Sequence, residues 1–206
     1  MGDPTIRSAP ALAALACAAL MTGCMSFRET NTVRTPEEQM LLSKSVDYTF
    51  DAMTFSKLSG RLVFVDATNL DCTDKAYVVD ALKQRLGMAG AKIVEKSGEA
   101  SAVVTVRSAM LSTQSGSALI GIPSIKVPLP IGGSTLETPE VALFKRAMQE
   151  GWCKLHVTAY DGDTRALLDK QEGAARTHFD RWHILFLVHF KRTNVPELQM
   201  SATGEH

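Results

Sequence analysis

The sequence feature that most constrains the fold is a long stretch, residues 108–136, that is almost without charge. Its 29 residues contain one charged side chain, Lys126, together with three prolines and four glycines. Such a stretch is too apolar to lie entirely in water and too rich in proline to form a central strand. We therefore expect an edge strand, a bulge or an extended loop. A loop of this length in a compact domain is uncommon and often functional.

Within this segment, large apolar residues alternate with Lys126 and two prolines; they are Ile125, Val127, Leu129 and Ile131. Two interpretations of this row stay open. It packs as a cover over an open sheet edge of the same chain, or it is an exposed apolar surface for a protein partner, another copy of the chain or lipid. We predict that residues 108–136 make the main intermolecular contact.

The first 24 residues predict a location. Residues 8–23 carry no charge, follow Arg7 and end in small residues, as in a secretory signal peptide. The run closes with Leu20-Met21-Thr22-Gly23-Cys24, which resembles a bacterial lipobox. The resemblance implies diacylglyceryl transfer to Cys24, cleavage before it and acylation of the new N-terminus. The alternative is an ordinary signal peptide with an incidental cysteine.

Two or more acyl chains would hold the protein stably at a membrane. An aspartate after the lipidated cysteine resembles an inner-membrane retention signal, and this chain has Met25 there. The outer membrane, facing the periplasm, is therefore favoured over the inner membrane. We divide the chain into a signal peptide (1–23), a tether (24–35) and a single α/β domain (36–206).

Apolar periodicity and capping residues predict the elements. Thr35, Pro36 and Glu38 indicate a capped helix start, and the helix should continue to about residue 57. Further helices are expected over 77–86 and 138–151. Strands are expected over 61–66, 92–95, 102–110, 153–159, 166–175 and 182–190, with a turn at Asp161-Gly162.

This order predicts an α/β (α+β) fold, with a mixed, mainly antiparallel sheet and helices packed on one face, in a single domain. A chain of this length buries enough surface to need no disulfide or structural metal. Cys72 and Cys153 either pair or remain thiols, and the sequence does not decide between these states.

Charge and motifs argue against several functions. The 22 basic and 22 acidic residues balance, which excludes a nucleic-acid binder that works through bulk positive charge. The common phosphate-loop, dinucleotide, nucleophile-elbow and HExxH motifs do not occur. We predict no catalytic residue and no cofactor, so a periplasmic hydrolase is only the third choice of function.

Two polar groups have simple interpretations. The first group is His178, Asp180 and His183, which supplies two imidazoles and one carboxylate on an extended segment. Zinc needs three or four convergent ligands, so we predict no metal site there. The second group follows a strand and is interpreted as helix-capping: Asp66, Asp71 and Asp74.

Four stretches look like a family of uncharacterised bacterial lipoproteins: 32–43 (TVRTPEEQMLLS), 63–66 (VFVD), 119–124 (LIGIPS) and 139–145 (PEVALFK). The likeness covers nearly the whole mature chain and brings no known activity. The element order and the hairpin at 160–164 are also similar to lipid-anchored subunits of the curli-secretion type. Those subunits oligomerise and insert hairpins into the outer membrane, and this second likeness rests on architecture alone.

Together these features predict a lipid-anchored lipoprotein of the periplasm or outer membrane that acts as a binding or envelope-assembly module without catalysis. The alternative is an oligomeric ring or secretion-type membrane subunit that uses residues 108–136. In both cases the lipid on Cys24 attaches the chain to the membrane, and no nucleic acid is bound.

Overall fold

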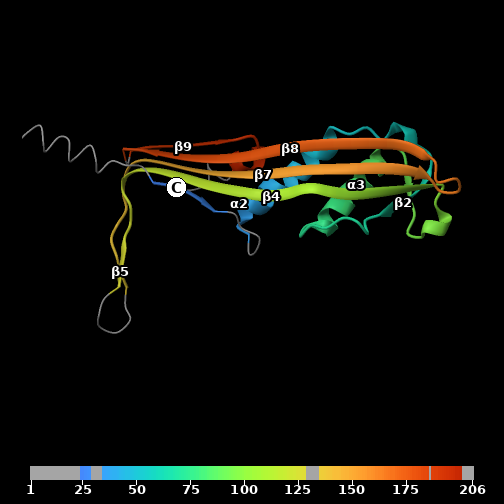
Figure 1. Ribbon diagram of the computed structural model, residues 1–206. Coiled ribbons are helices and arrows are strands. Elements are labelled where there is room, and N and C mark those ends of the chain that lie inside the picture. The colour runs from blue at the N-terminus through green and yellow to red at the C-terminus, as the bar shows by residue number, and fades with distance from the viewer. Residues whose placement is uncertain (1–23, 29–33, 129–134, 186, 201–206) are drawn as a thin grey trace, which may run out of the picture. The chain divides into compact units, whose positions relative to one another are not determined.

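The computed structural model describes residues 24–28, 34–128, 135–185 and 187–200 (Figure 1). The predicted signal peptide, residues 1–23, lies outside them. The helices are α2 (Pro36–Asp51), α3 (Lys75–Met88) and α4 (Pro196–Met200), with short 3-10 helices at Ser56–Leu58 and Ser97–Glu99. The strands are β1 (Cys24–Arg28), β2 (Leu62–Asp66), β3 (Lys92–Ile93), β4 (Ala102–Ile122), β5 (Lys126–Pro128), β6 (Thr135–Glu137), β7 (Val141–Asp161), β8 (Leu167–Ile184) and β9 (Val188–Thr193).

The main sheet is mixed and mostly antiparallel, which confirms the predicted α+β class. Its described strands follow the order β3-β2-β4-β7-β8-β9, and β1 pairs with β4 off this path. Strand β2 is parallel to both β3 and β4, whereas β1 is antiparallel to β4. Strands β5 and β6 form a separate antiparallel pair. The edge position of β5 suits Pro128, which has no backbone N–H to donate to a second neighbour.

The described residues gather into two compact units. Unit 1 comprises the chain up to Arg28 together with 115–148 and 180–192, and unit 2 comprises 29–114, 149–179 and 193–206. Strands β4, β7, β8 and β9 have residues in both units, β9 only through Thr193 in unit 2. All the described helices belong to unit 2, and the described part of unit 1 consists of strands and their connections.

Helix α2 begins where the sequence predicts. The Thr35 hydroxyl accepts a hydrogen bond from the Glu38 N–H at 3.2 Å, and the Glu38 carboxylate accepts one from the Thr35 N–H at 3.1 Å. This capping box satisfies two backbone donors that the first turn leaves unpaired. Pro36 occupies the first turn, where its missing N–H costs nothing. The helix ends at Asp51, earlier than predicted, and a 3-10 turn follows at Ser56–Leu58.

Unit 2 has one main hydrophobic core between its helices and its sheet. Helix α2 contributes Val46 and Phe50, both about 1% exposed, and α3 contributes Val78, Leu82 and Leu86. The sheet side is formed by these buried residues: Val63, Val65, Ala102, Val104, Val106, Cys153, Leu155, Val157 and Ala159. The alternation predicted over 153–159 is therefore confirmed, with the odd-numbered side chains facing the core.

Two glycines let α2 approach the sheet closely. A Cβ atom on Gly151 of β7 would lie 2.7 Å from the Leu41 carbonyl oxygen of α2. A Cβ atom on Gly173 of β8 would lie 2.6 Å from the Thr49 carbonyl oxygen of the same helix. Thr177 joins the two layers, because its hydroxyl donates to the Leu41 carbonyl oxygen at 2.7 Å.

Gly173→Ala tests this close approach. The added methyl group would meet the Thr49 carbonyl oxygen, so we expect a loss of about 1–3 kcal/mol in the free energy of unfolding. Urea denaturation measures it. Gly98→Ala is the matched control, because a Cβ atom there would meet nothing within 4 Å. Equal stability of the Gly173→Ala protein and the wild type would contradict the packing described.

The helix predicted over 138–151 is wrong. Residues from Val141 onward belong to the 21-residue strand β7. Thr138, expected to cap a helix, instead accepts a hydrogen bond from the Ile125 N–H at 2.9 Å through its hydroxyl. The Thr138 N–H donates to the Ile125 carbonyl oxygen at 3.0 Å. The threonine therefore closes the base of the β5–β6 hairpin, and pairing between strands overrides a local helix signal.

The strand predicted over 182–190 is also wrong in extent. The chain reverses within it, so that β8 ends at Ile184 and β9 begins at Val188. Leu185 takes a positive φ of 47°, and the Leu187 N–H donates to the Ile184 carbonyl oxygen at 3.2 Å. No glycine or proline marks this turn, so the continuous apolar run concealed it.

Two further expectations need correction. Part of the predicted tether, Cys24–Arg28, is strand β1, which pairs with Ser115–Leu119 of β4. The strand predicted over 102–110 continues to Ile122, so much of the segment 108–136 is paired strand and not a loop. The backbone of this segment is thus satisfied by neighbours that lie far away in the sequence.

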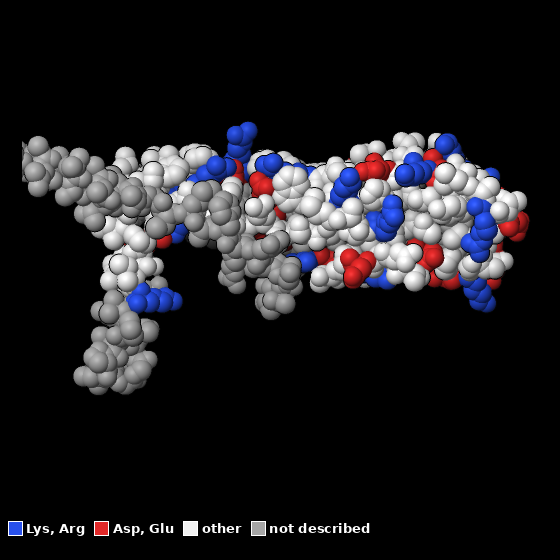
Figure 2. Space-filling model, viewed as in Figure 1, with Lys and Arg blue, Asp and Glu red and all other residues white. Residues whose placement is uncertain are grey.

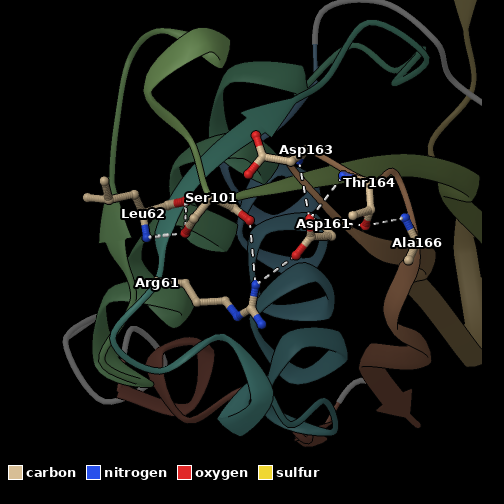
Figure 3. Close-up of polar contacts among 7 residues, drawn as sticks. All are labelled: Arg61, Leu62, Ser101, Asp161, Asp163, Thr164 and Ala166. Atoms are coloured by element: carbon tan, nitrogen blue, oxygen red, sulfur yellow. Dashed lines mark hydrogen bonds and ion pairs between the residues drawn. The ribbon is translucent and has the colours of Figure 1, made fainter.

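The predicted turn at Asp161-Gly162 joins β7 to β8 and carries a dense polar network (Figure 3). One Asp161 oxygen accepts hydrogen bonds from the N–H groups of Asp163 and Thr164, at 3.2 and 3.1 Å, and from the Thr164 hydroxyl at 3.1 Å. The other oxygen pairs with Arg61 at 3.3 Å. These bonds, chiefly from the Thr164 N–H, hold the pKa of Asp161 below its usual value.

Asp161→Asn tests the network through its pH dependence. A lowered pKa in the folded state means that the carboxylate contributes stability above the unfolded value of 3.8, and that this contribution is lost as the pH falls through the folded pKa. We expect the variant to melt at a lower temperature than the wild type at pH 7, with the difference vanishing at strongly acidic pH. Calorimetry across this range measures both. A difference that does not change with pH would contradict the role of the charge.

Candidate functional site

Only part of the predicted apolar row can be located. Leu129 and Ile131 lie outside the described residues. The backbone of Val127 pairs with Leu136 in the β5–β6 hairpin, and its side chain is not among those described. Ile125 is 54% exposed. The interpretation as a cover over the chain's own sheet therefore does not hold for Ile125.

Exposed apolar side chains extend well beyond the predicted row. We define the apolar rim as the eight large apolar residues of unit 1 that are between 41% and 86% exposed: Ile120, Ile122, Ile125, Val141, Leu185, Leu187, Val188 and Phe190. Among the side chains that the structure describes in unit 1, no large apolar one is fully buried. The described side chains of unit 1 therefore form no hydrophobic core.

The segments of the apolar rim adjoin one another. A Cβ atom on Gly121 would lie 2.1 Å from the Val141 carbonyl oxygen, so the end of β4 touches the start of β7. The Leu185 N–H donates to the Leu143 carbonyl oxygen at 2.8 Å, which joins the β8–β9 turn to the same part of β7. The backbone segments that carry the rim are thus in contact at the end of β4, the start of β7 and the β8–β9 turn.

Cys24 is the first residue of β1, and its partner on β4 is next to the apolar rim. In the antiparallel register of β1 and β4, Cys24 is opposite Leu119. Leu119 directly precedes Ile120, the first residue of the rim. The predicted lipidation site and the rim therefore belong to the same unit and to neighbouring strand positions.

An aromatic and charged cluster fixes β9 against β8 in this unit. The ring of Trp182 stacks on Phe190 with centroids 5.4 Å apart, and Phe144 meets Trp182 edge-on at 5.7 Å. The Arg146 guanidinium lies 4.6 Å from the Trp182 ring centroid and pairs with Asp180 at 2.9 Å. Sequence analysis missed this cluster, although Asp180 and Trp182 are spaced for one face of a strand.

The predicted His–Asp group does not converge on a common point. The His178 N–H donates to Asn194 Oδ1 at 2.8 Å, and Asp180 pairs with Arg146. The His183 ring lies 4.6 Å from that of His189. Desolvation, followed by the charges of His189, Lys145 and Arg181, lowers the pKa of His183. Within the described ranges, no three side chains of His, Cys, Asp or Glu are placed to hold a metal ion.

The aspartates after β2 have three different environments. Asp66 accepts hydrogen bonds from the N–H and the hydroxyl of Thr68, at 2.9 and 2.6 Å, which lower its pKa. Asp74 occupies the N-cap position of α3, but its carboxylate pairs with Arg34 and makes no capping hydrogen bond. Asp71 is exposed. The capping interpretation is therefore wrong for the side chain of Asp74.

Cys72 and Cys153 are free thiols. Cys153 is 1% exposed, and burial raises the pKa of its thiol to about 11. It is therefore protonated at neutral pH and packs as a small apolar residue of the core.

A hollow of about 710 Å³ lies beside α2 and α3 in unit 2, lined by Arg34, Met40, Tyr77 and their neighbours. Its polar groups are engaged with partners of their own. Arg34 pairs with Asp74, and the Tyr77 hydroxyl donates to Asp47 at 2.9 Å. Burial and this bond raise the pKa of Tyr77 to about 12. The hollow thus presents no activated acid or base from this tyrosine.

In the part of the chain that the structure describes, no helix is both long and apolar enough to cross a membrane. Comparison with known protein families and with curated proteins finds no match for this chain.

The double variant Ile122→Asp/Ile125→Asp tests whether the rim is exposed in the isolated protein. These side chains are 60% and 54% exposed, so we expect the free energy of unfolding to change by less than about 1 kcal/mol. Val104→Asp, at a fully buried position, should cost more than about 3 kcal/mol because it buries an unpaired charge. Thermal melting compares the two. A large loss in the double variant would show that the chain itself covers this part of the rim.

Proposed function

We propose that this protein is a lipoprotein anchored through Cys24 at the periplasmic face of the outer membrane, where it works as a binding or envelope-assembly module. The observation that carries the proposal is the apolar rim in unit 1, whose described side chains form no core, next to the strand that starts at Cys24. Large exposed apolar surfaces mark places where a protein meets something other than water.

In this proposal the two units have different roles. Unit 2 supplies stability, because its helices and sheet bury a continuous apolar core. Unit 1 supplies the binding surface, because its strands are long enough to satisfy their backbones while leaving apolar side chains exposed. Catalysis is not part of the proposal. The paired Arg34 and Asp74 and the separated histidines favour structural roles for these polar residues.

A second candidate is the oligomeric ring or secretion-type subunit that uses residues 108–136. One observation favours it: β9 comes last in the order of described strands, so its outer edge is open to a strand of another chain. Sedimentation of the detergent-extracted protein separates the candidates, because a ring requires a defined multimer and the module requires none.

Cys24→Ser tests the anchor. Only the thiol accepts a diacylglyceryl group, so the variant should lose the lipid and remain unprocessed at residue 24. Mass spectrometry of the wild-type N-terminal peptide, with fractionation of the envelope, measures the outcome. Cys72→Ser is the matched control and should leave lipidation unchanged. An unmodified Cys24 in the processed wild-type protein would refute the anchor.

A further inference from the structure

We infer that the apolar rim and the basic residues around it bind the surface of an anionic lipid bilayer. The inference rests on the proposed envelope function and names the partner of the same surface. It adds the β8–β9 turn as a second contact beside residues 108–136. The anchor would then hold unit 1 against the membrane in a set orientation and not as a freely tethered domain.

The β8–β9 turn exposes a large amount of apolar surface. Leu187 is 86% exposed, Leu185 59% and Val188 52%. Leu185 and Leu187 lie in the turn itself, where side chains project beyond the ends of the strands. Apolar side chains at a turn can enter the boundary between headgroups and acyl chains without taking strand backbone out of its hydrogen bonds.

Unit 1 carries a net positive charge. In the sequence, residues 24–28, 115–148 and 180–192, which make up unit 1 after the predicted signal peptide, contain seven lysines and arginines but three aspartates and glutamates. The charges of the whole chain balance. Two of the three acidic residues are paired with neighbours in unit 1: Glu140 with Lys145 and Asp180 with Arg146. Because these pairs lie within unit 1, they leave its net positive charge unchanged. A net positive charge attracts phosphate headgroups.

Basic residues also stand next to residues of the rim along the chain. Lys191 and Arg192 follow Phe190 on the exposed strand β9, and Lys126 follows Ile125 at the start of β5. Long basic side chains can reach the headgroups while neighbouring apolar side chains enter the acyl region. In Figure 2 lysine, arginine, aspartate and glutamate side chains are interspersed over the described face.

Cys24 lies close to the rim in the sheet. Its backbone lies opposite Leu119, one residue before the rim. Acyl chains attached there enter the bilayer next to the rim, so the rim meets lipid at a high local concentration. A rim exposed far from the lipidated residue would have no such advantage.

The two tryptophans of the chain provide the test, because each lies in a different unit. Trp182 stacks on Phe190 beside the rim in unit 1, whereas Trp152 lies in unit 2 and donates to Glu150 at 3.1 Å. Trp152→Phe leaves Trp182 as the sole reporter, and Trp182→Phe leaves Trp152. The membrane-extracted full chain is bound to vesicles of phosphatidylethanolamine and phosphatidylglycerol with brominated acyl chains, and quenching of fluorescence is measured.

We expect brominated lipid to quench Trp182 several-fold more than Trp152. Adding Leu187→Asp and Val188→Asp to the Trp152→Phe protein should remove the quenching of Trp182 while the melting temperature stays close to that of the parent. Met88→Asp is the matched control, since Met88 is 72% exposed in unit 2, and it should leave the quenching unchanged. Vesicles of phosphatidylcholine should give weaker quenching than the anionic vesicles.

The outcomes separate the inference from the proposed function. If Cys24 is acylated and the protein is bound, but Trp182 and Trp152 are quenched alike, the inference is overturned and the anchor stands. If Cys24 is unmodified but Trp182 is still quenched, the anchor fails and the lipid surface stands. An oligomer on the vesicles with unquenched Trp182 would assign the rim to a second copy, and equal quenching by neutral lipid would overturn the anionic preference.

Discussion

The rest of this structure depends on how much of the sheet is covered by helices. Helix α2 has 16 residues and lies in unit 2, whereas β4 and β7 have 21 residues each and contribute residues to both units. Apolar side chains of β4 are buried from Ala102 to Val106, and those of β7 from Cys153 to Ala159. In the described part of unit 1 the strand backbones are paired, but no helix is present to bury their side chains. Where those side chains are apolar, as in the rim, they stay exposed.

The sequence predicted the parts of the fold that depend on local chemistry. The capping box at Thr35 and Glu38, the turn at Asp161 and the alternation over 153–159 each follow from neighbouring residues. The 138–151 segment failed because its helix signal is equally local, whereas its strand state depends on β4 and β8, distant in sequence. The reversal at Leu185 failed for the opposite reason: a turn built from apolar residues carries no turn chemistry to detect.

The candidate site could be predicted only as a property of one segment. The scarcity of charge and the three prolines of residues 108–136 indicated Ile125 and its neighbours, because both features can be read directly from the sequence. The joining of that segment to the β8–β9 turn depends on the contact between Gly121 and Val141 and on the hydrogen bond from Leu185 to Leu143. Neither contact leaves a mark in the order of residues. The β1 pairing that places Cys24 beside the rim was hidden for the same reason, since a short polar segment looks like a tether until a partner strand is known.

The charges on β9 bear on whether lipid or a second copy of the chain covers the rim. Strand β9 ends the sheet, and its residues from Val188 to Arg192 are exposed. Antiparallel pairing of two β9 edges related by twofold symmetry would bring Lys191 and Arg192 of each copy close to those of the other. Like charges opposite one another destabilise such a pair, and lysine on an edge strand is a common device against edge pairing. An anionic bilayer presents the reverse situation, because each basic residue gains a phosphate partner while Val188 and Phe190 leave water. The same residues that oppose pairing between two β9 edges thus favour the lipid contact that we infer for the rim.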